Sequence, residues 1–205
     1  MGRGGAPSRR HRAGEVAVSR ANLPSQKEAI ASALALYDTR PFTVADIGSQ
    51  SAWLKAASHD ARNLYVSGPM GLASSVALGV AASRPNDQVL AVCGDGALAM
   101  NLSSLVTLQG ARTANLAVLV VANGIYEYTG SLPVPTRDLD WLLLGRGIFG
   151  AEGCFRLEDL TPEKWKTVKR PAMIVADIAP STEKTPALGM TPMQIRAAFL
   201  DAAKA

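Results

Sequence analysis

Short apolar segments that alternate with helical ones constrain this chain more than any other feature. The segment from Leu116 to Ala122 is apolar at every position, as in strands that are covered on both faces. Shorter segments of this kind recur, and the expected strands cover residues 42–48, 63–68, 88–96, 115–124, 153–157 and 171–178. The expected helices cover residues 24–40, 71–83, 97–110, 138–150, 161–170 and 191–205. Strands that alternate with helices predict an α/β fold, a doubly wound parallel sheet with helices on both faces.

Local signals predict where several helices begin and end. Ser25, followed three positions later by Glu28, is the pattern of a capping box at the start of the first helix. Thr161 and Pro162 are a cap and a first helical residue for the segment that follows them. Gly110 is expected to close the helix over 97–110.

The formal net charge of the 205-residue chain is +4, and it is located at the amino terminus. The first 20 residues contain five arginines and one glutamate, so the remainder is neutral. We expect residues 1–22 to form a disordered basic leader and residues 23–205 to form one folded domain. A partner- or RNA-binding arm is the alternative for the leader. Nucleic-acid binding by the neutral folded part is not expected.

Composition excludes several other classes. No segment approaches the 18 consecutive apolar residues of a transmembrane helix, so no membrane insertion is expected. Two cysteines, Cys93 and Cys154, are too few for a disulfide framework or for a four-cysteine metal or iron–sulfur site. We therefore expect a cytoplasmic protein.

Four of the expected strands end in glycine or polar residues. These turns are Asp46–Ser49, Ser67–Gly71, Gly94–Gly96 and Asn123–Gly124. Ligands of open parallel sheets bind outside the carboxyl ends of the strands, so the four turns are expected to meet at one site. Glycines and the start of the helix over 71–83 would let backbone N–H groups approach an anion. This pattern indicates a cradle for a diphosphate.

A divalent cation would neutralise such a ligand, because the turns contain no lysine or arginine. Asp95 and Asn123 lie 28 positions apart, each directly after an expected strand. One strand–helix–strand unit would bring them together. Carboxylate and amide oxygens suit Mg²⁺, which keeps water and binds phosphate oxygens.

The glycine–aspartate–glycine turn at 94–96, followed 25 residues later by Ala122 and Asn123, resembles the fingerprint of thiamine-diphosphate-dependent 2-oxoacid decarboxylases. The resemblance covers roughly residues 40–178. It implies that Mg²⁺ is held by Asp95, Asn123 and the carbonyl of Ile125. It also implies that Met70 keeps the cofactor bent. The cofactor-binding residues implied are Gly48, Ser49, Gly68, Met70, Gly94, Asp95, Gly96, Ala97, Asn123 and Ile125.

Within this family, the segments at 67–75 and 94–105 are most similar to sulfopyruvate and phosphonopyruvate decarboxylases. The resemblance implies conversion of 3-sulfopyruvate to sulfoacetaldehyde and CO₂. Ala122 departs from the family's first asparagine, and Pro69 and Glu127 depart from the small residue and glycine of the nearest relatives. Alternatives are phosphonopyruvate decarboxylation, carboligation as in acetolactate-synthase-like enzymes, and a non-catalytic cofactor-binding subunit.

The family activates its cofactor with a glutamate on a pyrimidine-binding domain, for which 205 residues leave no room. The resemblance therefore implies a β-type subunit in a hetero-oligomer with an α-type partner, acting on a small 2-oxoacid. His59 is either a surface residue or a proton-transfer residue. Glu127 and Tyr128 are either solvated loop residues or residues that face the substrate. Neither cysteine lies in the electropositive setting that a nucleophile requires.

Overall fold

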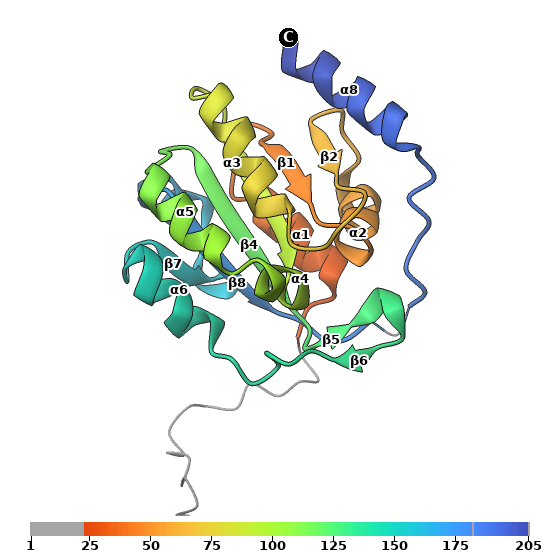
Figure 1. Cartoon of the computed structure of the whole chain (residues 1–205). Helices are drawn as coiled ribbons and strands as arrows, with labels where there is room; N and C mark the ends of the chain where they lie inside the picture. The colour runs from red at the N-terminus through yellow and green to blue at the C-terminus, as the bar shows by residue number, and fades with distance from the viewer. Residues whose placement is uncertain (1–22, 182, 205) are drawn as a thin grey trace, which may run out of the picture.

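The computed structural model describes residues 23–181 and 183–204 and contains a six-stranded sheet between two layers of helices (Figure 1). The expected leader at 1–22 lies outside the described residues. All neighbouring strands of the sheet are parallel, which confirms the predicted fold class. The strands, in spatial order, are β2 (Asn63–Tyr65), β1 (Phe42–Ala45), β3 (Val89–Gly94), β4 (Leu116–Ala122), β8 (Ala172–Asp177) and β7 (Cys154–Arg156).

Alternate residues of the central strands supply two separate cores. In β3, Leu90 and Val92 join one apolar cluster, whereas Ala91 and Cys93 join the other, as the period of two in a strand requires. One face is covered by α1 (Gln26–Leu34), α2 (Ser49–Ser58) and α7 (Pro162–Thr167). The other face is covered by α3 (Ala73–Ser83), α4 (Asp95–Met100), α5 (Ser103–Ala111) and α6 (Trp141–Phe149). The last helix, α8 (Pro192–Lys204), packs at the β2 edge and contributes Phe199 to this second cluster and Ile195 to the first.

Several predicted helix boundaries are confirmed and two are wrong. Ser25 and Glu28 form a reciprocal capping box at α1, and Thr161 caps α7 with Pro162 in its first turn. The helix expected over 97–110 is instead two helices, α4 and α5, because Asn101 leaves the helical conformation. Gly110, which was expected to close a helix, lies inside α5; that helix runs to Ala111 and is capped by Arg112 in the left-handed conformation. α4 also starts at Asp95, so this acid belongs to a helix rather than to the preceding turn.

The order in which the chain adds strands to the sheet reverses between β1 and β3. From β1 the chain runs through α2 to β2 on one side, and from β2 through α3 to β3 on the other. α2 packs on one face of the sheet and α4 packs on the opposite face. The amino-terminal ends of these two helices therefore flank a crevice at the carboxyl ends of β1 and β3, which is the usual ligand site of such sheets.

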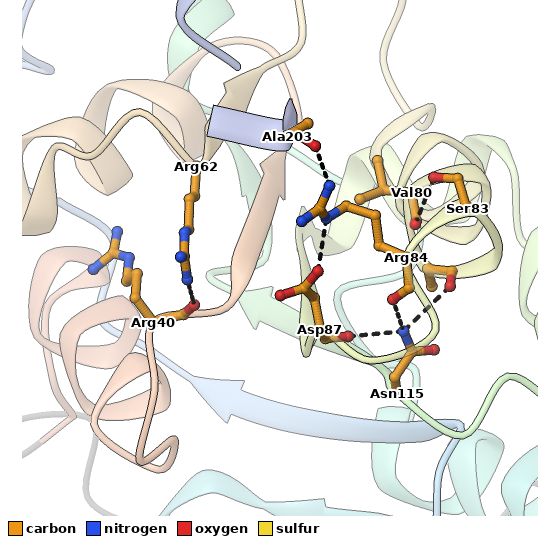
Figure 2. Close-up of polar contacts among 9 residues, drawn as sticks. Arg40, Arg62, Val80, Ser83, Arg84, Asp87, Asn115 and Ala203 are labelled. Carbon is orange, nitrogen blue, oxygen red and sulfur yellow. Dashed lines mark hydrogen bonds and ion pairs between the residues drawn. The ribbon is translucent and has the colours of Figure 1, made fainter. Parts of the chain in front are cut away.

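Polar contacts close the opposite, amino-terminal edge of the sheet (Figure 2). Arg84, directly after α3, donates to Asp87 and to the carbonyl oxygen of Ala203 in α8. The Asn115 side chain donates to the backbone carbonyl of Ala81 in α3 and to those of Arg84 and Asp87 in the segment that leads from α3 to β3. The Arg84 guanidinium also lies 4.7 Å from the centre of the Phe42 ring. These contacts hold α8 against the first residue of β1.

Within the described ranges, none of the helices combines the length and the apolar character needed to cross a membrane.

Candidate functional site

A pocket of about 200 Å³ lies at the crevice between β1 and β3. Its walls come from the ends of these two strands, the turn before α3 and the segment after β4. Nine of the ten residues expected to bind the cofactor line it, namely Gly48, Ser49, Gly68, Met70, Gly94, Asp95, Gly96, Ala97 and Ile125. The fold thus brings together four segments that are up to 77 positions apart in sequence, counted from Gly48 to Ile125.

Asp95 joins the ends of β3 and β4. Its Oδ1 accepts from the backbone N–H of Gly96, and its Oδ2 accepts from that of Gly124, both at 2.9 Å. The residue is 2% exposed. Burial raises the pKa of the Asp95 carboxyl above its ordinary value, and the two N–H groups oppose this rise. The carboxylate is therefore oriented by backbone groups at the wall of the pocket.

Asn123 lies beside this acid, because Gly124 is its neighbour in the chain. Its Oδ1 accepts from the backbone N–H of Ile125 at 3.0 Å, and its Nδ2 donates to Glu127 at 2.9 Å. Asp95 therefore lies beside the Asn123–Ile125 segment, as expected for residues that follow β3 and β4, although Asn123 is the one expected cofactor-binding residue that does not line the pocket. Among the described residues, no group of three or more His, Cys, Asp or Glu side chains is arranged to hold a metal. A cation here would depend on mixed oxygen donors, which Mg²⁺ accepts.

The sequence analysis placed the Asp46–Ser49 turn at this site but gave the Asp46 side chain no role, although it shapes the site. This fully buried acid follows β1, and its Oδ1 accepts from the N–H groups of Gly71, Leu72 and Ala73 at 3.0–3.2 Å. It therefore caps α3 from another strand and fixes the turn that carries Met70. Burial raises the pKa of the Asp46 carboxyl. An acid directly after a buried strand was the signal that could have identified it.

A small antiparallel hairpin, β5 (Ile125–Tyr126) and β6 (Leu132–Pro133), packs over the cradle, the part of the pocket formed by Gly48, Ser49 and Gly94–Ala97. It lies beyond the carboxyl end of β4, away from α8 (Figure 1). The Tyr128 ring packs on Gly48, where an added Cβ would lie 3.3 Å from it, and Gly48 has φ +88°. The Tyr126 ring packs still closer on Gly96, at 2.5 Å from an added Cβ. Glycine at these two positions lets the hairpin approach the cradle.

His59 is not brought to this site. It is the C-cap of α2, whose 10 residues place it roughly 15 Å from the cradle. Its Nδ1 is hydrogen-bonded to the Tyr65 hydroxyl at 2.8 Å. The geometry gives His59 a structural contact at the amino-terminal edge of the sheet and no contact with the pocket.

Both cysteines are fully buried, in agreement with the expectation that neither is a nucleophile. Burial raises the pKa of Cys154 to about 11 and that of Cys93 well above its ordinary value.

Comparisons with known proteins agree with this geometry. Residues 46–139 match the family described as "Thiamine pyrophosphate enzyme, C-terminal TPP binding domain". The chain is 30% identical to sulfopyruvate decarboxylase subunit beta of Methanococcus maripaludis, with 82% of this chain and 92% of the relative covered. It is 31% identical to the protein of the same name from Methanocaldococcus jannaschii, with coverage of 78% and 87%. Phosphonopyruvate decarboxylase of Streptomyces hygroscopicus is 31% identical, with coverage of 67% and 35%.

Solved structures show the same fold. A putative thiamin diphosphate-dependent enzyme from Mycobacterium smegmatis superimposes with a TM-score of 0.61 at 18% identity, with 77% of this chain and 32% of that chain covered. Benzoylformate decarboxylase from Polynucleobacter necessarius gives 0.59 at 18% identity, with coverage of 82% and 36%. This chain therefore spans about a third of each of these larger proteins. Together with the sequence matches, these findings show that the chain belongs to the family of thiamine-pyrophosphate-binding enzymes that includes the sulfopyruvate decarboxylase beta subunits.

Proposed function

We propose that this chain is the β-type subunit of a thiamine-diphosphate-dependent 2-oxoacid decarboxylase that converts 3-sulfopyruvate to sulfoacetaldehyde and CO₂. The observation that carries the proposal is the meeting of Asp95 with the Asn123–Gly124 turn at the crevice of the sheet. The similarity to sulfopyruvate decarboxylase beta subunits over most of their length supports the choice of substrate.

The donor set fits a magnesium–diphosphate group. The Asp95 carboxylate, the Asn123 amide oxygen and the Ile125 carbonyl would hold Mg²⁺. Gly48 and Ser49 lie at the amino-terminal end of α2 and line the pocket, where N–H groups favour an anion. Met70 would keep the two rings of the cofactor apart. When bound, thiamine diphosphate supplies the electron sink that decarboxylation of a 2-oxoacid requires.

The size of the pocket supports a partner. Pockets that enclose a whole ligand measure roughly 300–1,000 Å³, whereas this one measures about 200 Å³. The chain would then enclose only the diphosphate end of the cofactor. An α-type subunit would supply the pyrimidine-binding domain and the activating glutamate, in keeping with relatives that are named as beta subunits. The two buried free thiols fit a reducing cytoplasm.

Phosphonopyruvate is a second candidate substrate. Phosphonopyruvate decarboxylase of Streptomyces hygroscopicus is 31% identical to this chain over 140 residues, about the same identity as the sulfopyruvate decarboxylase beta subunits. Both compounds are 2-oxoacids with an anionic tail. The two substrates are distinguished by their aldehyde products.

Co-expression with the α-type partner, followed by assay of CO₂ and aldehyde from both oxoacids, tests the proposal. We expect release of CO₂ and sulfoacetaldehyde that requires Mg²⁺ and thiamine diphosphate. A condensed hydroxyketone without free aldehyde would instead identify a carboligase. Absence of CO₂ with every oxoacid would favour a non-catalytic cofactor-binding subunit.

Asp95→Ala is expected to weaken Mg²⁺-dependent cofactor binding by about 100-fold or more, because it removes the only carboxylate of the proposed donor set. Calorimetry of the co-purified complex measures this change. Asp201→Ala is the matched control, since Asp201 is an exposed acid of α8. Asp95→Asn keeps an acceptor for one of the two backbone N–H groups and guards against loss of the fold. Unchanged affinity in both Asp95 variants would contradict the ligand role.

A further inference from the structure

The pocket is lined by two charged side chains, and both are acids. One is Asp95, and the other is Glu127, in the hairpin that covers the cradle. Glu127 Oε2 accepts from Asn123 Nδ2 at 2.9 Å, and Oε1 lies 3.5 Å from Trp53 Nε1 of α2. Glu127 is half-buried and Trp53 is buried. The carboxylate therefore connects the hairpin to the end of β4 and to the helix across the crevice.

These contacts determine which end of the Asn123 amide faces which group. Its Nδ2 donates to a carboxylate, and its Oδ1 accepts from the backbone N–H of Ile125. If the amide turned over, Oδ1 would meet the Glu127 carboxylate and Nδ2 would meet the N–H of Ile125. Both contacts would then be repulsive, because an oxygen would face an oxygen and a donor would face a donor.

The orientation matters for a cation, because only the oxygen of a neutral amide binds Mg²⁺. Oδ1 receives a single hydrogen bond in the structure and a carbonyl oxygen has two lone pairs. One lone pair of Asn123 Oδ1 therefore remains without a hydrogen bond and is free to bind a cation. With Nδ2 held by Glu127, the amide presents its oxygen on the side away from that carboxylate.

We infer that Glu127 is a positioning residue, which fixes the Asn123 amide so that its oxygen faces the magnesium ion of the cofactor. This inference depends on the proposed function. Groups that orient a metal ligand typically contribute about 10- to 100-fold to metal affinity. Glutamine at position 127 would keep an acceptor for Asn123 Nδ2, whereas alanine would remove it.

The test measures Mn²⁺ affinity in the presence of thiamine diphosphate, by electron paramagnetic resonance of the free ion. It uses the full chain co-purified with its α-type partner. We expect Glu127→Ala to weaken Mn²⁺ binding about 10-fold or more and Glu127→Gln to restore affinity to within about threefold of the wild type. Glu152→Ala, which removes an exposed acid in the turn between α6 and β7, is the matched control. Thermal melting of each variant verifies the fold.

The outcomes separate three roles. Equal Mn²⁺ affinity in wild type and Glu127→Ala would overturn the inference and leave the proposed function intact. Loss of affinity in Glu127→Gln as large as in Glu127→Ala would also overturn it, because the charge would then act on the ion directly. A lower kcat in Glu127→Gln with unchanged affinity in both variants would identify a proton-transfer role instead. Absence of Mn²⁺ binding by the wild-type complex would overturn the proposed function together with this inference.

Discussion

Two buried acids of this chain perform different tasks at the scale of single residues. Asp95 faces the pocket and receives one N–H on each oxygen. Asp46 is fully buried and does not line the pocket, and one of its oxygens accepts from three N–H groups. The first arrangement leaves lone pairs directed to a ligand, whereas the second uses its oxygen to hold a turn. Type of residue and position after a strand are the same in both, so sequence pattern alone does not distinguish them.

Asp46→Ala is expected to lower the free energy of unfolding by about 3–5 kcal/mol, because three N–H groups lose their acceptor in a buried place. Asp46→Asn keeps an acceptor oxygen and should cost less, about 1–2 kcal/mol. Urea unfolding measures both changes. An equal loss in the two variants would contradict the role of the oxygen as an acceptor.

The same residue predicts a dependence on pH. Burial raises the pKa of Asp46 in the folded state, so between the unfolded and folded pKa values the folded state binds more protons. The free energy of unfolding of the wild type should therefore rise, relative to that of Asp46→Asn, as the pH falls from 7 towards 4. Urea unfolding at both pH values measures the difference. A difference between the two proteins that falls over this range would contradict the raised pKa.

At the scale of elements, the sequence predicted those features that depend on neighbours along the chain. The capping box at Ser25, the Thr161–Pro162 start of α7 and the apolar run of β4 are local signals, and each is confirmed. The convergence of four strand ends was also predictable, because parallel strands have their carboxyl ends at one edge. α2 was not anticipated, since no side chain caps its start at Gly48 and half of its buried residues are the polar Ser49, Gln50 and Ser51.

The hairpin over the cradle was likewise expected only as a loop. β5 and β6 contain two residues each and include Pro133, so no strand pattern is long enough to identify them. The side chains of Tyr126 and Tyr128 hold the hairpin on glycines that are distant in sequence. Such contacts depend on the assembled fold. For the same reason, the hydrogen bond between Glu127 and Asn123 could not be deduced from spacing.

Gly96→Ala is expected to displace this hairpin. An added Cβ would lie 2.5 Å from the Tyr126 ring and 2.8 Å from Val134 Cγ1, and overpacking of this kind costs about 1–3 kcal/mol. Urea unfolding measures the loss of stability. Tyr126→Ala in the same chain should recover part of it, because the closer contact disappears. Gly110→Ala, where an added Cβ meets nothing within 4 Å, is the control and should not destabilise the protein.

At the scale of the whole molecule, the carboxyl and amino-terminal edges of the sheet have different functions. The carboxyl edge carries the pocket, whereas the amino-terminal edge holds α8 through Arg84 and the Phe42 ring, which meets Phe199 edge-on at 5.6 Å. β3 joins the two edges with six residues, roughly 20 Å of extended chain. Every residue of β3 is buried. The strand therefore separates the pocket at one edge of the sheet from the α8 contacts at the other edge.

A double-mutant cycle across the sheet tests this separation. Arg84→Ala should lower the free energy of unfolding by about 1–2 kcal/mol, because it removes hydrogen bonds to Asp87 and α8 and the stacking on Phe42. Its cofactor affinity should equal that of the wild type. In the double variant with Asp95→Ala, the two decreases in the free energy of unfolding should add to within about 0.5 kcal/mol, because the two sites are far apart and share no partner. Urea unfolding and calorimetry of all four proteins measure both quantities. A coupling energy above about 1 kcal/mol, or a cofactor affinity that falls with Arg84→Ala, would show that α8 controls the cofactor site through the sheet.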